Sequence, residues 1–155
     1  MALDFTVILF QRQHFGNEPN YLSMNAPFVG KSKDYSFDCP NVNPNETAIL
    51  LFQSYDVTTG RNRFRINGVE VFGGLPVGPE GKSVGAGQRL NILMSNVLLV
   101  ESRHQLRASG NVLHVEAQAA QTGSTDIDDF ILDNVVIVFK TTSTPRPQPE
   151  PQPTI

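Results

Sequence analysis

The stretch LRASGNVLHVEAQ, residues 106–118, is the most informative segment of this chain. Its Ser109-Gly110-Asn111 step is typical of a turn, because glycine accepts positive φ and asparagine hydrogen-bonds to nearby backbone. The residues that follow alternate between apolar and polar, with Leu113, Val115 and Ala117 set against His114, Glu116 and Gln118. This period of two predicts a half-buried strand introduced by the turn. Leu106 is expected to pack beneath the turn.

Other segments of the chain have the same character. The pair Asn67-Gly68 lies between two alternating runs and predicts a tight hairpin. TAILLFQSY, residues 47–55, is the strongest candidate for a central strand, and 128–140 is predicted to be buried on both faces toward its end. Further strands are expected at 3–10, 34–40 and 110–119. The segment 90–102 is compatible with a short helix or with a strand.

About eight short strands with turn residues between them predict an all-β fold, an antiparallel β-sandwich of the jelly-roll type. The single domain is expected to span residues 1–140. From residue 141 the composition changes to TTSTPRPQPEPQPTI, with proline at every second position from 145 to 153. Proline at this density favours an extended tail or linker at 141–155, outside the domain.

Composition and charge argue against several classes of protein. The formal net charge is −3, so the basic surplus typical of nucleic-acid binders is missing. No apolar run reaches the roughly 18 residues of a membrane-spanning helix. One cysteine, Cys39, allows no internal disulfide. Together with the lack of a basic leader, this favours a cytoplasmic protein, with export by a non-standard route as the alternative.

Motifs that could carry catalysis are weak. GPEGKS, residues 78–83, ends like a phosphate-binding loop, but proline occupies the position where that motif needs its first glycine. His14, His104 and His114 do not have the spacing of zinc ligands. Cys39 is expected to be a small core residue and not a nucleophile. The sequence therefore predicts a protein that is not an enzyme.

An acidic group near the C-terminal strand offers oxygen ligands of the kind that calcium prefers: Asp126, Asp128, Asp129 and Asp133. Their spacing does not match the helix-loop-helix calcium loop. Two readings stay open. Either Asp126, Asp128 and Asp129 bind Ca²⁺, or they form a solvated turn and the protein has no cofactor.

Residues 47–140 resemble the galactose-binding-like jelly-roll domain of carbohydrate-binding modules and glycoside hydrolase accessory domains. The resemblance rests on the order of four segments: TAILLFQSY, FRINGVEVF, LRASGNVLHVEA and FILDNVVIVF. It implies a sandwich whose loops at one end can bind a glycan. Under that reading Tyr55, Arg61, Arg63 and the loop 73–87 would contact the ligand. The chain has no Trp and three Tyr, however, so few rings are available for stacking on sugars.

The favoured function is therefore a non-catalytic module that acts as a structural, assembly or accessory protein-interaction domain. Its partner would be another protein or a second copy of the chain, and neither nucleic acid nor a membrane is expected. One form of self-association would pair the arginines at 61, 63 and 65 with the acidic group of another copy. A carbohydrate-binding module is the alternative.

Overall fold

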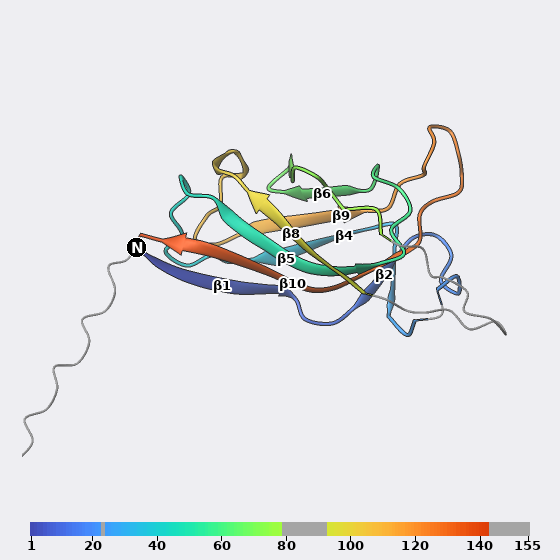
Figure 1. The fold of residues 1–155 in the computed structure, drawn as a ribbon, viewed down its shortest axis with the longest axis horizontal. Coiled ribbons are helices and arrows are strands. Elements are labelled where there is room, and N and C mark those ends of the chain that lie inside the picture. The colour runs from blue at the N-terminus through green and yellow to red at the C-terminus, as the bar shows by residue number, and fades with distance from the viewer. Residues whose placement is uncertain (23, 79–92, 143–155) are drawn as a thin grey trace, which may run out of the picture.

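The computed structural model describes residues 1–22, 24–78 and 93–142, which form a two-layer β-sandwich (Figure 1). The strands follow one another along the chain in this order: β1 (Ala2–Leu9), β2 (Gln13–Phe15), β3 (Phe28–Gly30), β4 (Ser32–Phe37), β5 (Ala48–Tyr55), β6 (Arg63–Ile66), β7 (Val69–Glu70), β8 (Met94–Val100), β9 (Asn111–Glu116) and β10 (Phe130–Thr141). The one helical element among the described residues is a 3₁₀ turn, Ser102–His104. No helix in this part of the chain is long and apolar enough to span a membrane.

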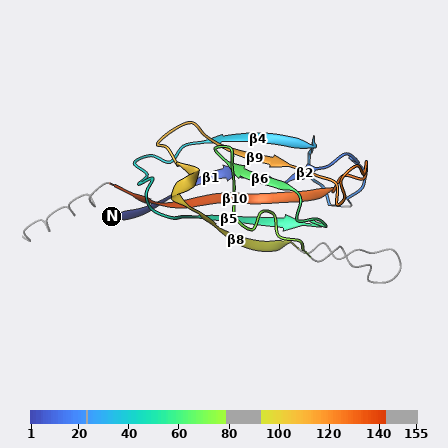
Figure 2. The same ribbon diagram turned by 90° about the horizontal axis from the view of Figure 1, so that it is seen from above.

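The strands divide into two sheets that face each other (Figure 2). Sheet A has the order β3-β2-β10-β5-β8, and β1 also pairs with β10. Sheet B has the order β4-β9-β6-β7. All pairs are antiparallel except β2 with β3. The predicted all-β sandwich is thus confirmed, while its jelly-roll winding stays a prediction.

Strand β10 is the central strand of sheet A because it is long enough to pair with three others. Its first residues pair with β2 and its last seven with β1, on one side, while β5 runs along the other side. The register of β10 with β5 shifts between Asp133 and Val136, and Asn134 has a φ of 49° at this irregularity. The left-handed conformation of one residue lets β10 bend and continue.

The core lies between the two sheets and is built from the inward residues of both. Phe15 and Phe130 stack at a ring distance of 5.3 Å, and Phe52 meets Phe64 across the sandwich at 5.1 Å. All four are almost fully buried. A smaller cluster of Leu22, Tyr55 and Ile131 lies apart from this core. Burial of these side chains is the main term that favours the folded chain.

The turn at 109–111 has the predicted geometry. Gly110 has a φ of +71°, and Leu106, Leu113 and Val115 are buried in the core. Asn111 is fully buried, accepts the backbone N–H of Arg107 at 2.9 Å and donates to the Arg107 carbonyl at 2.7 Å. The asparagine therefore closes the loop that leads into β9.

The predicted hairpin and the ambiguous segment are also resolved. Asn67 and Gly68 have φ values of 51° and 82°, and Ile66 pairs directly with Val69, as a two-residue type I′ turn requires. The segment 90–102 contains a strand, β8, and no α-helix among its described residues. β10 extends to Thr141, the first residue of the predicted tail, and residues 143–155 of that tail lie outside the described part, as do residues 79–92.

Candidate interaction surface

The outer face of sheet A carries two rows of apolar side chains that cross four strands. In the first row Phe5, Val138, Ile49 and Leu99 are register partners from β1 to β8. The second row lies two residues further along each strand and consists of Val7, Val136, Leu51 and Val97. Leu3 extends the surface at the β1 side. We call these nine residues the apolar face.

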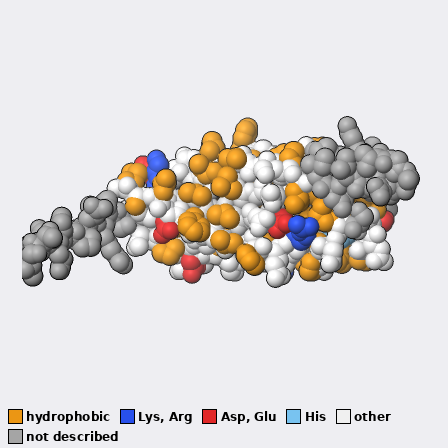
Figure 3. Space-filling model, turned by 60° about the horizontal axis from the view of Figure 1, so that its bottom comes forward, with side chains coloured by type: hydrophobic (Ala, Val, Ile, Leu, Met, Phe, Trp, Pro, Cys, Tyr) orange, Lys and Arg blue, Asp and Glu red, His pale blue; other side chains and the backbone are white. Residues whose placement is uncertain are grey.

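Most of the apolar face is open to solvent. Seven of its members, all but Val136 and Val138, are between 37% and 72% exposed. The two valines of β10 are half-buried beneath their neighbours. Figure 3 shows hydrophobic side chains gathered across the middle of the molecule, with few charged groups among them. The sequence-based prediction that residues 128–140 are buried on both faces toward their end is therefore corrected, because over the second half of β10 the sandwich covers the inner face alone.

The apolar face is comparable in size with the apolar patches that are often functional on monomeric proteins. Seven apolar side chains that are between 37% and 72% exposed present on the order of several hundred Å² to water. The largest contiguous apolar patch on a typical monomeric protein is about 300–600 Å², and such patches are often functional. A continuous surface of this size is typical of a site that contacts another molecule.

Polar groups border the apolar face at both ends of the strands. At one end Lys140 forms an ion pair with Glu46 at 2.8 Å. At the other end Arg12 pairs with Asp133 at 3.1 Å. Each pair contains one positive and one negative charge, so these borders add no net charge to the face. An apolar centre with a polar rim is the usual composition of a protein–protein interface.

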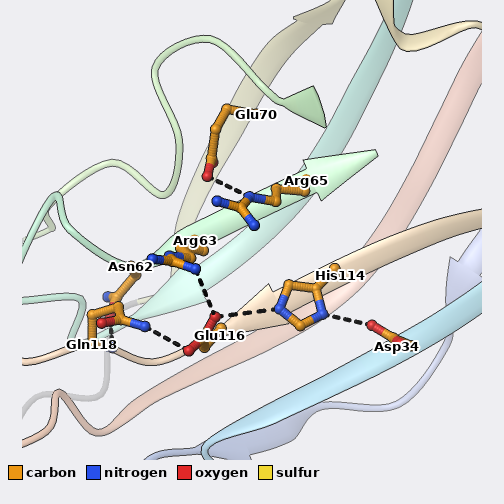
Figure 4. A network of polar contacts seen from close by, with 8 residues as sticks. All are labelled: Asp34, Asn62, Arg63, Arg65, Glu70, His114, Glu116 and Gln118. Carbon is orange, nitrogen blue, oxygen red and sulfur yellow. Dashed lines mark hydrogen bonds and ion pairs between the residues drawn. The ribbon is translucent and has the colours of Figure 1, made fainter. Parts of the chain in front are cut away.

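The outer face of sheet B is different in kind, because it carries a network of polar contacts (Figure 4). The network comprises Asp34, Asn62, Arg63, Arg65, Glu70, His114, Glu116 and Gln118. Arg63 lies 3.7 Å from Glu116 and Arg65 lies 2.5 Å from Glu70. These arginines have acidic partners within the chain, which leaves little reason to expect that they bind the acidic group of a second copy.

The sequence contained a signal for the apolar face. The runs at 7–9, 49–51, 97–100 and 135–138 are continuously apolar. In an antiparallel sheet with one wet face, apolar and polar residues normally alternate. Continuous runs in strands that are covered on one side must place apolar residues in water. The sequence analysis took the run at 135–138 as evidence of burial on both faces and so missed the surface.

The residues predicted to bind a ligand are not brought together. Tyr55 lies in sheet A, is 2% exposed and packs with Leu22 and Ile131, so its ring offers no stacking surface. Arg63 lies on the outer face of sheet B, on the other layer of the sandwich. Arg61 is exposed and donates to the Thr122 hydroxyl at 2.9 Å. Of the predicted binding loop 73–87, residues 79–87 lie outside the described part.

The predicted metal ligands do lie close together. Asp126, Asp128 and Asp129 line a cleft of about 200 Å³ together with Glu18 and Tyr21. The fourth acidic residue, Asp133, is instead the partner of Arg12.

Two of the three carboxylates already accept hydrogen bonds inside the protein. Asp128 accepts from Thr58 and Asn62, each at 2.6 Å. Asp129 lies 2.8 Å from the buried His14 ring. The described residues contain no group of three or more His, Cys, Asp or Glu side chains placed to hold a metal ion, and the calcium site stays a prediction.

Cys39 is fully buried in the main core. Burial, together with the nearby carboxylates of Asp38 and Asp4, raises the pKa of its thiol to about 12. The reactive thiolate form is therefore suppressed at neutral pH.

Comparisons of this chain with known proteins found no match. No family model, no curated protein and no solved structure matches this chain. The functional interpretation therefore rests on the chemistry of the surfaces described above.

Proposed function

We propose that this protein is a non-catalytic assembly module, a β-sandwich that binds another protein surface through the apolar face of sheet A. The observation that carries the proposal is the exposure of two complete rows of apolar side chains across β1, β10, β5 and β8. On the strands of sheet B no large apolar side chain reaches this exposure and charged residues point outward, although Phe10 and Phe72 are exposed outside the strands.

The physical argument is the cost of leaving this surface in water. Fully burying a Val, Leu, Ile or Phe side chain contributes about 1.5–3 kcal/mol, so covering these seven half-exposed side chains would contribute on the order of 5–10 kcal/mol before the entropy of association is subtracted. Exposed β-branched and aromatic side chains on a sheet also promote aggregation. A partner that covers the face removes both effects.

The shape of the apolar face favours a protein partner over a small ligand. The apolar residues stand on a sheet, in rows that extend over four neighbouring strands, and a small molecule would cover a fraction of them. Sites for small ligands are concave and enclose most of the ligand surface. A broad protein surface matches the extent of the rows.

Site-specific photo-crosslinking tests the proposal. A benzophenone amino acid is introduced at Leu99, on the apolar face, and at Ser36 as the control, since Ser36 is exposed on β4 of sheet B. Each full-length variant is irradiated in cells that contain the protein and its natural partners. We expect a defined protein adduct from position 99 and none from position 36.

The outcomes separate clearly. A discrete adduct from position 99 alone, whether to another protein or to a second copy, supports binding through the apolar face. Adducts of equal yield from both positions, or none from position 99, would overturn the proposal. A carbohydrate-binding function would instead give no protein adduct and would show retention on a polysaccharide matrix that free sugar reverses.

A further inference from the structure

The apolar face has three properties that together narrow the identity of its partner: its lateral extent, its charge and its pattern of side chains. Each can be assessed from residues already described. The inference drawn here rests on the proposed function and concerns what covers that same face.

The first property is the extent of the sheet. Four strands at about 4.8 Å spacing span roughly 19 Å, and the seven residues over which β1 pairs with β10 extend for about 24 Å. The four-stranded area therefore measures roughly 450 Å² on each copy, or about 900 Å² for two copies, close to the ~1,000 Å² total of a small specific interface. The apolar rows would form its centre, with the two ion pairs at its ends. One further sheet of the same dimensions would cover it fully.

The second property is charge. The nine residues of the apolar face include no charged side chain, and the borders consist of the balanced pairs Lys140–Glu46 and Arg12–Asp133. The apolar face therefore has no electrostatic potential complementary to a strongly acidic or basic partner. A neutral surface bordered by balanced ion pairs is complementary to another surface of the same composition.

The third property is the side-chain pattern. The rows combine β-branched residues with Phe5 and leucines, at the two-residue repeat along each strand. Two antiparallel sheets pack face to face at about 10 Å with their side chains interdigitated, as the two layers of a sandwich do. The outer face of sheet A has the composition of the inner face of such a layer.

We propose that the apolar face is covered by the same face of a second copy of this chain, around a twofold axis that lies between the two A sheets. The interface is then isologous, with each row meeting a row of the partner. The assembly has four layers, in which the two A sheets are internal and the two polar B sheets face solvent. The residues 143–155 are a poor alternative cover, because Ile155 is their one large apolar side chain.

Sedimentation equilibrium of the full-length chain tests this inference. We expect a mass of about twice 17.1 kDa over a wide range of protein concentration. Val97→Lys and Phe5→Lys each place a charge in the proposed interface. Because a buried charge without a partner is strongly unfavourable, each variant should raise the dissociation constant at least ~100-fold. Ser36→Lys adds the same charge to sheet B and should leave the mass unchanged.

Val97 and Phe5 are 65% and 64% exposed in the single chain, so neither substitution should lower the stability of the monomer. Circular dichroism checks that both variants fold. A wild-type protein that is monomeric throughout would overturn the second-copy inference. So would a dimer that neither lysine variant weakens. If the chain is monomeric while position 99 crosslinks to a different protein, the proposed function stands and this inference fails.

Discussion

The side-chain amide of Asn67 donates to the Asn111 side-chain oxygen at 3.0 Å, joining the β6–β7 turn to the first residue of β9. The same Asn67 amide donates to the His104 carbonyl at 2.9 Å, and its oxygen accepts the Val112 N–H at 3.0 Å. Two asparagines from separate turns thus bind one another and hold the 3₁₀ turn against sheet B. Each turn stabilises the other because the polar groups of both would otherwise be buried without partners.

Asn111→Ala should lower the free energy of unfolding by about 2–4 kcal/mol. The substitution leaves the Arg107 N–H, the Arg107 carbonyl and the Asn67 amide without their buried partner. Denaturant titration measures the loss. Asn45→Ala, at an exposed position, is the control and should change stability by less than about 0.5 kcal/mol. Equal effects from the two substitutions would show that the Asn67–Asn111 contact contributes nothing specific.

Gly16→Ala should destabilise the fold severely. Gly16 has a φ of +144°, and an added Cβ would lie 2.0 Å from the Asp129 Oδ1 atom, which is itself held by the His14 ring. Neither the backbone nor the buried carboxylate can yield easily, so we expect a loss of about 3 kcal/mol or more. Gly60→Ala meets no atom within 4 Å and should lie within about 1 kcal/mol of wild type. Thermal melting of both variants makes the comparison, and similar melting temperatures would contradict this account.

Asp128→Ala should cost roughly 2–4 kcal/mol of stability, because this buried carboxylate accepts four hydrogen bonds. Its donors are the Thr58 N–H and hydroxyl, the Thr59 N–H and the Asn62 amide. Asp126→Ala removes a neighbouring exposed carboxylate and should leave the unfolding midpoint nearly unchanged. A larger loss from Asp126 than from Asp128 would mean that the exposed carboxylate has a role that these hydrogen bonds do not explain.

Removal of metal ions separates the two readings of the acidic group. The oxygens of Asp128 and Asp129 already accept hydrogen bonds from protein donors. We therefore expect the melting temperature to be the same with added calcium and with a chelator. A melting temperature that falls on chelation, and that recovers with calcium in wild type but not in Asp126→Asn, would instead establish a calcium site.

Stability should decline in alkaline solution. The pKa of the Cys39 thiol is raised from about 9 in its ordinary environment to about 12, chiefly by burial. Burial raises the pKa of the Tyr35 phenol in the same direction. Above about pH 9 the folded state holds protons that the unfolded state releases. The free energy of unfolding therefore has its full value below pH 9 and falls as the pH rises toward 12.

Denaturation measured from pH 7 to 11 checks this slope. Cys39→Ala should lie lower in stability at neutral pH, because it creates a cavity, and should show a shallower alkaline decline. An identical decline in both proteins would mean that other groups control the alkaline transition. A thiol reagent at pH 8 should modify Cys39 only as fast as the protein opens.

Local signals in the sequence were sufficient for several of the longer strands and for two turns. Period-two alternation identified β9, the Asn67-Gly68 pair identified its hairpin, and Gly110 marked the turn before β9, because each depends on residues within a few positions of one another. The short strands β2 and β3 were not predicted individually, because residues 11–33 indicate a polar loop with one short extended piece. β2 forms because the distant strand β10 supplies its backbone partners, and β3 in turn pairs with β2.

The candidate surface, too, could be predicted from the sequence only in part. The sequence by itself determined that the chain forms an all-β sandwich and that several strands carry apolar residues on both sides. Only the tertiary structure decided which of those sides is covered. Sheet B lies against one face of β1, β5, β8 and β10 and leaves the other open, and this depends on how distant strands pair. Alternation along a strand reports two faces, but long-range packing determines which of them meets water.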